Sequence, residues 1–413
     1  MLHDGDCAVS AAGTRDAMPR SVTPAERDTL AAGIRLAVFS DTWLPQVNGV
    51  TRTLDRLVKA VRARGGEARA YTTTDPGAQD DPCIVRYPSR PFWAYPQLQL
   101  ARPDKAWAVR ELSDWKPTLV HASTPFGLGL SGRAAARALT LPFVTSYHTS
   151  LSAYAKFYHL GVFAGPGWAF LRWFHNSGLR TYCPTHAIEQ ELVARDFTGM
   201  HIWSRGIDAD RYSPAFRSRE LRAELGISDD TFLVTYIGRI ALEKGLDTLV
   251  KGMHDVVARA GTRKIAFALA GDGPYDATCR REAPAGTQFV GMISGDRLSA
   301  FYASGDLFVF PSVTDTFGNV LLEAMASGLP ILGAESGPTK ELLASGRGAL
   351  FPEADAGGLA TEILALADDP SRRARMRDAG LGYARARSWD TIFDELVLDY
   401  RDAIGEATHL PRP

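Results

Sequence analysis

The chain has 413 residues, which predicts two or three domains with a core that needs no covalent cross-links. Its 46 Lys and Arg against 47 Asp and Glu give a net charge of -1, which excludes the basic surface of a nucleic-acid-binding protein and the acidic excess of a disordered chain. The four cysteines lie far apart, which excludes a disulfide framework or structural zinc site and indicates a reducing compartment.

The two ends of the chain are expected to be disordered tails. Residues 1–32 carry scattered charges among small residues and lack the apolar run of a secretory signal. Residues 405–413 have a similar composition. The sequence also has no run of about 18 apolar residues, so we expect no membrane-spanning segment.

Strands and helices are expected to alternate after the first tail. Short apolar runs predict buried parallel strands, and apolar residues on one face predict a helix over 50–64 that ends at Gly65 and Gly66. The expected strands of this first series are 34–40, 68–73, 118–122, 142–148 and 180–183.

A second series of the same kind follows Pro214, with helices that include 246–257 and 320–326. Its expected strands are 232–238, 265–270, 288–290, 307–310, 331–333 and 349–351. Two successive series predict an α/β protein with two doubly wound, Rossmann-like parallel sheets, linked near residues 205–214. Because open parallel sheets bind ligands at the carboxyl ends of their strands, the loops there are the candidates for chemistry.

The first candidate loop is residues 40–51, in which Gly49 stands where a helix begins. A glycine there lets a phosphate approach the free N–H groups of the helix. The alternative is an ordinary turn glycine, and the dinucleotide pattern G-x-G-x-x-G is absent.

The second candidate loop, residues 238–245, contains Gly238, Arg239 and Lys244. A guanidinium fork and a compact ammonium group together suit a diphosphate, whereas the alternative is a solvated loop with two ordinary cations. The next loop, residues 271–274, reads GDGP and predicts a tight turn that closes its strand.

The most informative segment is residues 310–326, where strand, loop and helix follow in order. Asp315 precedes the helix, and Glu323 lies inside it among apolar neighbours, so a solvent-facing position is disfavoured. Carboxylates at these places can accept hydrogen bonds from vicinal hydroxyls. His148, at the end of an earlier strand, is either structural or functional.

Together these segments resemble glycosyltransferase family 4, the retaining group with the GT-B architecture, over about residues 33–405. The late motif of that family is a Glu, seven residues and a second Glu, and this chain has Asp315 and Glu323 at these places. The resemblance implies an acceptor-side domain over 33–205, a nucleotide-sugar-binding domain over 206–386, and a last helix over 387–405 that packs back onto the first domain.

The resemblance also implies roles. Arg239 and Lys244 look like the pair that holds the donor diphosphate, Gly49 looks like the glycine beside it, and His148 looks like the histidine near the reacting sugar. Glu323 looks like the ligand of the ribose hydroxyls.

For the donor sugar, the resemblance implies contacts with Asp315 and with the N–H groups of Phe317, Gly318 and Asn319. The segment from Val290 to Ile293, which includes Met292, resembles the turn that binds the nucleobase.

Residues 43–50, 147–149 and 172–176 are similar to bacterial GDP-mannose-dependent mannosyltransferases and to sulfoquinovosyl or glucosyl lipid glycosyltransferases. We therefore expect a retaining hexosyltransferase that uses a nucleotide-diphosphate sugar, with GDP-mannose preferred over a UDP-sugar, and a lipid or glycan acceptor. No cofactor or metal is expected, because Arg239 and Lys244 can neutralise the leaving diphosphate. The alternative from another class is a non-catalytic nucleotide-sugar-binding protein.

An aromatic stretch over residues 154–174, with Lys156, Arg172 and Arg180 near it, has two interpretations. It either rests on an anionic membrane surface or forms an ordinary amphipathic core segment. Under either interpretation we expect a cytoplasmic protein. If the stretch rests on a membrane, we also expect peripheral association with the inner face of the plasma membrane.

Overall fold

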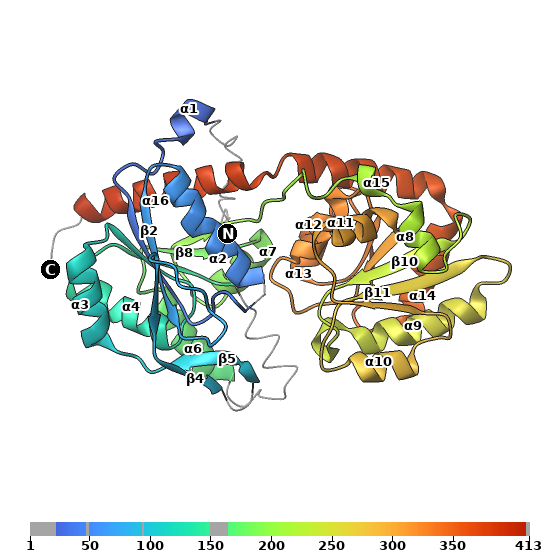
Figure 1. Ribbon diagram of the computed structural model, residues 1–413, viewed down its shortest axis with the longest axis horizontal. Coiled ribbons are helices and arrows are strands. Elements are labelled where there is room, and N and C mark those ends of the chain that lie inside the picture. The colour runs from blue at the N-terminus through green and yellow to red at the C-terminus, as the bar shows by residue number, and fades with distance from the viewer. Residues whose placement is uncertain (1–21, 47–48, 93–94, 149–163, 410–413) are drawn as a thin grey trace, which may run out of the picture.

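Two parallel sheets, each covered by helices on both faces, form two lobes that lie side by side (Figure 1). The computed structural model describes residues 22–46, 49–92, 95–148 and 164–409. Part of the aromatic stretch, residues 154–163, therefore lies outside the described residues.

The first lobe contains a seven-stranded parallel sheet with the order β3-β2-β1-β6-β7-β8-β9. Its strands are β1 (Arg35–Ser40), β2 (Glu67–Thr73), β3 (Ile84–Tyr87), β6 (Leu119–Ala122), β7 (Phe143–Ser146), β8 (Arg180–Cys183) and β9 (Met200–Ile202). Its helices are α2 (Gly49–Ala63), α3 (Lys105–Trp115), α4 (Gly127–Ala138), α6 (Ala164–His175) and α7 (His186–Val193), and an antiparallel pair, β4 (Ser89–Phe92) and β5 (Tyr95–Ala101), lies outside the sheet.

The second lobe contains a six-stranded parallel sheet with the order β12-β11-β10-β13-β14-β15. Its strands are β10 (Phe232–Ile237), β11 (Ile265–Ala270), β12 (Gln288–Gly291), β13 (Leu307–Phe310), β14 (Ile331–Ala334) and β15 (Ala349–Phe351). Its helices are α8 (Arg219–Glu224), α9 (Leu246–Arg259), α10 (Asp276–Glu282), α11 (Gly295–Ser304), α12 (Asn319–Ala326), α13 (Gly337–Leu343), α14 (Ala356–Asp368) and α15 (Pro370–Arg385), with short 3-10 turns η2 (Pro214–Phe216) and η3 (Leu242–Lys244).

The predicted fold class is confirmed, and the buried strands lie within one or two residues of the expected runs. The sequence reasoning missed β3, β9 and the β4–β5 pair. Strand β3 has four half-buried residues and β9 has three residues, so neither presents the continuous apolar run that identifies a central strand.

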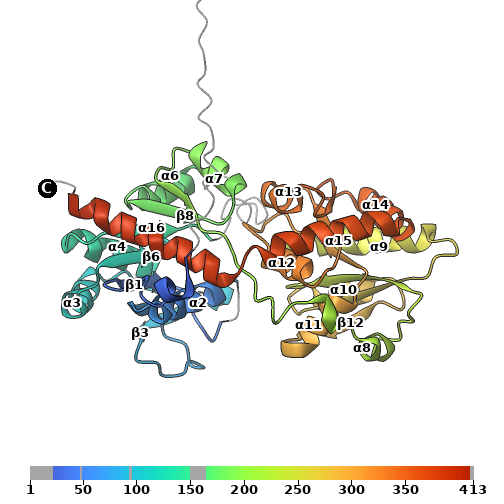
Figure 2. The same ribbon diagram turned by 90° about the horizontal axis from the view of Figure 1, so that it is seen from above.

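The chain crosses between the lobes twice, and the two crossings are hydrogen-bonded to each other. The Ile207 amide donates to the Arg387 carbonyl at 2.8 Å, and a Cβ on Gly206 would lie 2.6 Å from the Trp389 backbone. After the second crossing, α16 (Trp389–His409) runs along the first lobe (Figure 2).

Helix α16 is held against the first lobe by an apolar face and a buried ion pair. Phe393, Leu396 and Val397 are buried against the core of that lobe, where each large apolar side chain contributes about 1.5–3 kcal/mol. The Arg64 guanidinium is buried with its Nη2 2.7 Å from Asp394 Oδ1. The prediction of a tail from residue 405 is wrong for the described part, because the helix continues to His409.

The prediction of a disordered tail over residues 1–32 is also wrong for residues 22–32. Thr23 begins a short helix, α1 (Pro24–Arg27), through a capping box with Glu26. Arg27 Nε lies 2.8 Å from Asp394 Oδ2 of α16, and Leu30 and Ala31 are buried. The segment is thus held by an ion pair to a residue far along the chain and by two buried apolar side chains. Such contacts leave no periodic pattern in the sequence, which is why the segment was not predicted.

Candidate active site

Loops at the carboxyl ends of the two sheets meet between the lobes. The hydroxyl of Thr316, in the loop after β13 (residues 311–318, here the β13 loop), donates to the His148 carbonyl at 2.8 Å. The Thr185 hydroxyl, which follows β8, donates to the Thr316 carbonyl at 3.2 Å. The structure therefore brings the predicted loops of both lobes into contact.

Lys244 and Asp315 form an ion pair inside this region. Lys244 Nζ lies 2.7 Å from Asp315 Oδ1, with the two side chains 17% and 26% exposed. Ser312 Oγ donates to the other carboxylate oxygen of Asp315 at 2.5 Å. The predicted diphosphate cation and the predicted sugar-side carboxylate thus share one site at the ends of the neighbouring strands β10 and β13.

The backbone around Gly238 is packed too closely for side chains. A Cβ on Gly271 would lie 1.8 Å from the Gly238 carbonyl oxygen, and one on Gly273 would lie 2.3 Å from that of Ile240. The GDGP turn therefore supports the loop that carries Arg239. The Arg239 side chain is 38% exposed, and its Nη1 lies 3.9 Å from Glu243 Oε1.

The start of α12 faces the start of α2 across the lobes. Gly318 caps α12 in a left-handed conformation with φ of 81°, and no side chain accepts a capping hydrogen bond there. Phe317 is buried and anchors the loop. A Cβ on Gly49 would lie 3.1 Å from Asn319 Nδ2, so the glycine predicted beside the diphosphate is a neighbour of a residue predicted at the donor sugar. This pairing of helix N-termini suits an anion.

Glu323 is held by two tyrosines rather than by solvent. The Tyr302 hydroxyl donates to Glu323 Oε2 at 2.8 Å, and Tyr212 also donates to the carboxylate. Burial raises the pKa of Glu323, and the hydrogen bonds from both tyrosines and the charges of Arg52 and Arg211 oppose that rise. The carboxylate is therefore oriented and partly desolvated, as a ligand of hydroxyl groups requires.

His148 is enclosed by partners on both ring nitrogens. Its Nε2 lies 2.7 Å from Ser146 Oγ, and its Nδ1 lies 3.0 Å from Arg205 Nη2. Burial, followed by the charge of Arg205, lowers the pKa of His148 well below its ordinary value. Burial lowers the pKa of Arg205 only to about 10, so the guanidinium keeps its proton at neutral pH.

The two residues of the predicted nucleobase turn differ in their surroundings. Met292 is 77% exposed, whereas Ile293 packs against the core of the second lobe. The preceding Gly291 carbonyl accepts a hydrogen bond from the Gly271 amide at 2.8 Å, which ties this turn to the GDGP turn.

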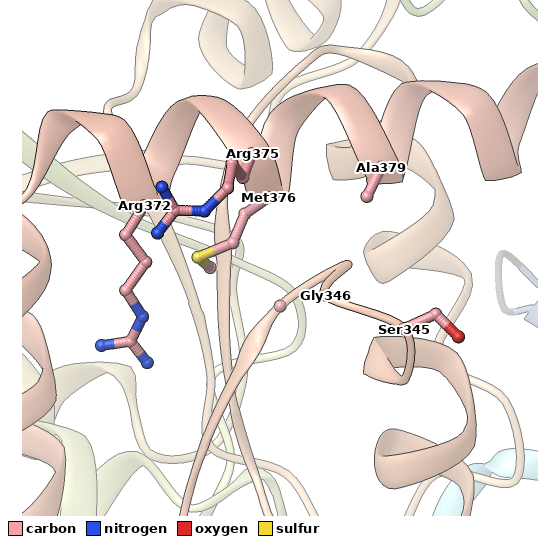
Figure 3. A pocket seen from close by; sticks show the side chains of 7 residues that line it. Ser345, Gly346, Arg372, Arg375, Met376 and Ala379 are labelled. Carbon is pink, nitrogen blue, oxygen red and sulfur yellow. The ribbon is translucent and has the colours of Figure 1, made fainter.

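Elsewhere in the second lobe, a hollow of about 360 Å³ lies between α15 and the loop after α13 (Figure 3). Its lining includes Ser345, Gly346, Arg372 and Arg375 but none of the predicted site residues. In the described part of the chain, no three His, Cys, Asp or Glu side chains gather where they could hold a metal ion.

Comparison with known proteins identifies the family. Residues 47–211 match the family described as Glycosyltransferase Family 4, and residues 231–369 match the one described as Glycosyl transferases group 1. The GDP-mannose-dependent alpha-mannosyltransferase of Mycobacterium tuberculosis is 31% identical over 384 residues, which cover 91% of this chain and 98% of that protein. The chain is a family 4 glycosyltransferase.

Two further proteins extend the comparison. The sulfoquinovosyl transferase SQD2 of Arabidopsis thaliana is 31% identical over 369 residues, which cover 84% of this chain and 69% of that protein. The crystal structure of Anabaena Alr3699/HepE in complex with UDP-glucose has a TM-score of 0.71 at 20% identity, covering 90% of this chain and all (100%) of that one. The two-lobed fold of the glycosyltransferase is thus GT-B.

Several residues around the site of this glycosyltransferase escaped sequence reasoning. Arg205 and Ser146 contact His148, and Tyr302 and Tyr212 contact Glu323. Ser146 lies near the carboxyl end of the predicted strand 142–148, and this position was a usable signal. Arg205 lies in a crossing and Tyr302 inside a helix, where no motif distinguishes them.

Helix α6, the described part of the aromatic stretch, has one buried side and one exposed aromatic side. Leu171 and Phe174 are buried, whereas Phe170 and Trp173 are 36% and 49% exposed. Arg180, expected to join a basic surface, is instead buried and paired with Asp399 and Glu406 of α16. No helix within the described residues is both long and apolar enough to cross a membrane.

Proposed function

We propose that this glycosyltransferase moves mannose from GDP-mannose to a lipid or glycan acceptor with retention of configuration. The observation that carries the donor assignment is the 31% identity to the GDP-mannose-dependent enzyme of M. tuberculosis, which extends over 91% of this chain. A second protein with that name, from Corynebacterium glutamicum, is 30% identical over 92% of this chain.

The charges around the β13 loop support such a reaction. As the sugar leaves, negative charge grows on the nucleotide diphosphate, and positive charge grows on the sugar ring. Lys244, Arg239 and the amides at the start of α12 supply positive charge for the diphosphate, and Asp315 supplies negative charge on the sugar side. We propose that the acceptor attacks from the face that the diphosphate leaves, and that a leaving phosphate oxygen takes the acceptor proton.

This arrangement supplies the charge stabilisation that a bound metal would otherwise provide. We therefore propose that transfer needs neither a metal nor a cofactor. Contacts between the lobes, such as that of Thr316 with His148, exclude water from the reacting sugar and limit hydrolysis.

A second candidate uses a UDP-sugar and a diacylglycerol-type lipid. It is favoured by the identity of 31% to the sulfoquinovosyl transferase and of 28% to an alpha-monoglucosyldiacylglycerol synthase of Streptococcus pneumoniae. The exposed Phe170 and Trp173 on α6, with Arg133 stacked 3.9 Å from the Trp173 ring centre, offer a surface for a lipid acceptor.

A donor panel separates the candidates. Melting temperature and release of nucleoside diphosphate are measured with GDP-mannose, UDP-glucose and UDP-sulfoquinovose, each with and without a diacylglycerol acceptor. A donor at 100 times its dissociation constant stabilises the fold by about 2.7 kcal/mol. We expect GDP-mannose to give the largest shift. A shift only with UDP-sugars favours the second candidate. Donor binding without release of nucleoside diphosphate, with and without the acceptor, indicates a non-catalytic protein.

A further inference from the structure

His148 lies at a junction of both lobes and one crossing. Its ring nitrogens contact Ser146 of β7 at 2.7 Å and Arg205 of the first crossing at 3.0 Å. Its main-chain carbonyl accepts the hydroxyl of Thr316, in the β13 loop of the second lobe, at 2.8 Å. The side chain is therefore fixed from one side and the main chain from the other.

The hydrogen-bond donors determine which nitrogen of His148 carries the proton. A guanidinium can only donate, so Nδ1 of His148 must accept from Arg205. A neutral imidazole has one N–H group, which is then on Nε2 and donates to Ser146 Oγ. Both nitrogens are thus used inside the protein, and neither is available to take a proton from an acceptor.

Arg205 is itself held in one orientation. Its Nη1 donates to the carbonyls of Trp203 and Ser204 at 2.7 and 3.1 Å, and its guanidinium lies 5.2 Å from the centre of the Trp203 ring. Two residues later, the Ile207 amide is bonded to Arg387 of the second crossing. The donor to His148 is therefore fixed to the segment that joins the two lobes.

Ser146 extends the contacts to α16. Its hydroxyl lies 2.8 Å from Nε2 of His121, and Nδ1 of His121 lies 2.6 Å from the Tyr400 hydroxyl. Burial lowers the pKa of His121 to about 3, so this second ring is neutral as well. The hydrogen bonds from Tyr400 through His121 hold the Ser146 hydroxyl in place. That hydroxyl in turn holds Nε2 of His148 in one position.

We propose that Arg205 is a positioning residue for sugar transfer, which holds His148 as the Nε2–H tautomer with its carbonyl against Thr316 of the β13 loop. The proposal rests on the proposed function, since it assigns Arg205 a role in the same reaction. Arg205 acts through His148, because its side chain donates hydrogen bonds to His148 and to two neighbouring carbonyls. Its loss therefore disturbs the reacting geometry more than the binding of the donor.

The kinetic test compares Arg205→Met, Arg205→Lys, His148→Ala and the double variant Arg205→Met/His148→Ala. We expect Arg205→Met to lower kcat by about 10- to 100-fold while the donor KM changes by less than about threefold. Arg205→Lys, which keeps a charged donor, should recover part of the rate. The double variant should be no slower than His148→Ala alone, because both changes remove one contact.

The matched control is Arg347→Met. Arg347 also donates to two main-chain carbonyls, of Leu342 and Glu341, and these belong to α13 of the second lobe. It should lower the melting temperature without changing the kcat of the folded protein. A folded Arg205→Met with near-native kcat, or additive losses in the double variant, would overturn the proposal.

A measurement without turnover separates this inference from the proposed function. In a ¹⁵N-histidine spectrum, the His148 signals are assigned by their loss in His148→Ala. We expect Nδ1 without a proton and Nε2 with one in the wild-type protein, and a mixture of tautomers in Arg205→Met. A protonated Nδ1 in the wild type overturns the inference even if transfer is observed. Failure of every donor overturns the proposed function and with it the role of Arg205 in transfer, but not the tautomer of His148.

Discussion

Lys244 Nζ and Asp315 Oδ1 lie 2.7 Å apart although the two residues are 71 positions apart in the chain. Both follow strands that are neighbours in the second sheet, β10 and β13. The cation that we propose for the leaving diphosphate and the carboxylate that we propose for the sugar are thus paired with each other, which holds both side chains in one orientation.

Replacing Lys244 should mainly affect the chemical step. Loss of one group that stabilises transition-state charge typically costs about 10²–10³ in kcat, so we expect a fall of that size in Lys244→Ala. Donor KM should rise less, since the variant keeps Arg239 and the helix N-termini that we propose to bind the phosphates. Lys244→Arg should recover part of the rate, because a planar fork does not reproduce a point charge. The measurement is kcat and donor KM for both variants.

Lys251→Ala is the matched control for this prediction. Lys251 Nζ lies 3.8 Å from Asp247 Oδ2 on the surface of α9, with its side chain 72% exposed. It should leave both constants unchanged. A near-native kcat in folded Lys244→Ala would show that Lys244 has no role in the reaction. The alternative, a solvated loop with two ordinary cations, would then be favoured.

Removal of divalent metals should leave transfer intact. If Lys244, Arg239 and the α12 amides neutralise the leaving group, EDTA should lower the initial rate by less than about twofold. Rates are compared in EDTA alone and with Mg²⁺ or Mn²⁺ added back in excess. Activity that disappears with EDTA and returns only with metal would contradict metal-independent transfer.

The strand ends could be predicted from the sequence, but the pairings between loops could not. Apolar runs located β10 and β13, and therefore placed Lys244 and Asp315 at the same edge of one sheet. Their ion pair depends on which strands are neighbours, and this order leaves no local signal. Arg205 lies in the first crossing between the lobes, and His148 follows β7. No periodic pattern in the sequence predicts their contact.

The exposed side of α6 gives a test of membrane association. The double variant Phe170→Ser/Trp173→Ser should weaken binding to phosphatidylglycerol vesicles by about tenfold or more, since about 1.4 kcal/mol of lost burial is a factor of ten. Melting temperature should change little because both side chains are substantially exposed. Phe216→Ser, at an aromatic residue 39% exposed in the second lobe, is the control. Equal vesicle binding by all three proteins would contradict a membrane role for α6.

The N-terminal segment should contribute to stability. Deleting residues 1–33 removes the Arg27 contact with Asp394 and the burial of Leu30 and Ala31, which together should cost about 2–4 kcal/mol. Deleting residues 1–21 leaves those contacts in place and serves as the control. Urea unfolding of both truncated proteins gives the difference. Equal free energies of unfolding would show that residues 22–33 add nothing to the fold.

The buried Glu323 carboxylate should lower the free energy of unfolding at neutral pH, where it is more ionised than at low pH. Burial raises its folded-state pKa above the ordinary value of 4.5. A carboxyl with a raised folded pKa contributes most below its unfolded pKa, and this contribution declines as pH rises through the folded pKa. We therefore expect the stability of the wild type to fall relative to Glu323→Gln as pH rises above the ordinary carboxyl pKa of 4.5 and through the raised pKa of the folded state. Glu353→Gln, at an exposed position of the same lobe, is the control.

The same substitution should weaken nucleotide binding. A hydrogen bond to a charged group contributes about 1.5–3 kcal/mol, so Glu323→Gln should raise the dissociation constant of GDP by about 10- to 100-fold if the carboxylate accepts the ribose hydroxyls. Calorimetric titration with GDP measures the constant, and urea unfolding at several pH values measures the stability difference. If the difference in free energy of unfolding between Glu323→Gln and the wild type is the same at every pH, the carboxylate does not destabilise the fold when it ionises. A variant that binds GDP as tightly as the wild type would refute the ribose contact, while the kinetic role of Lys244 would stand.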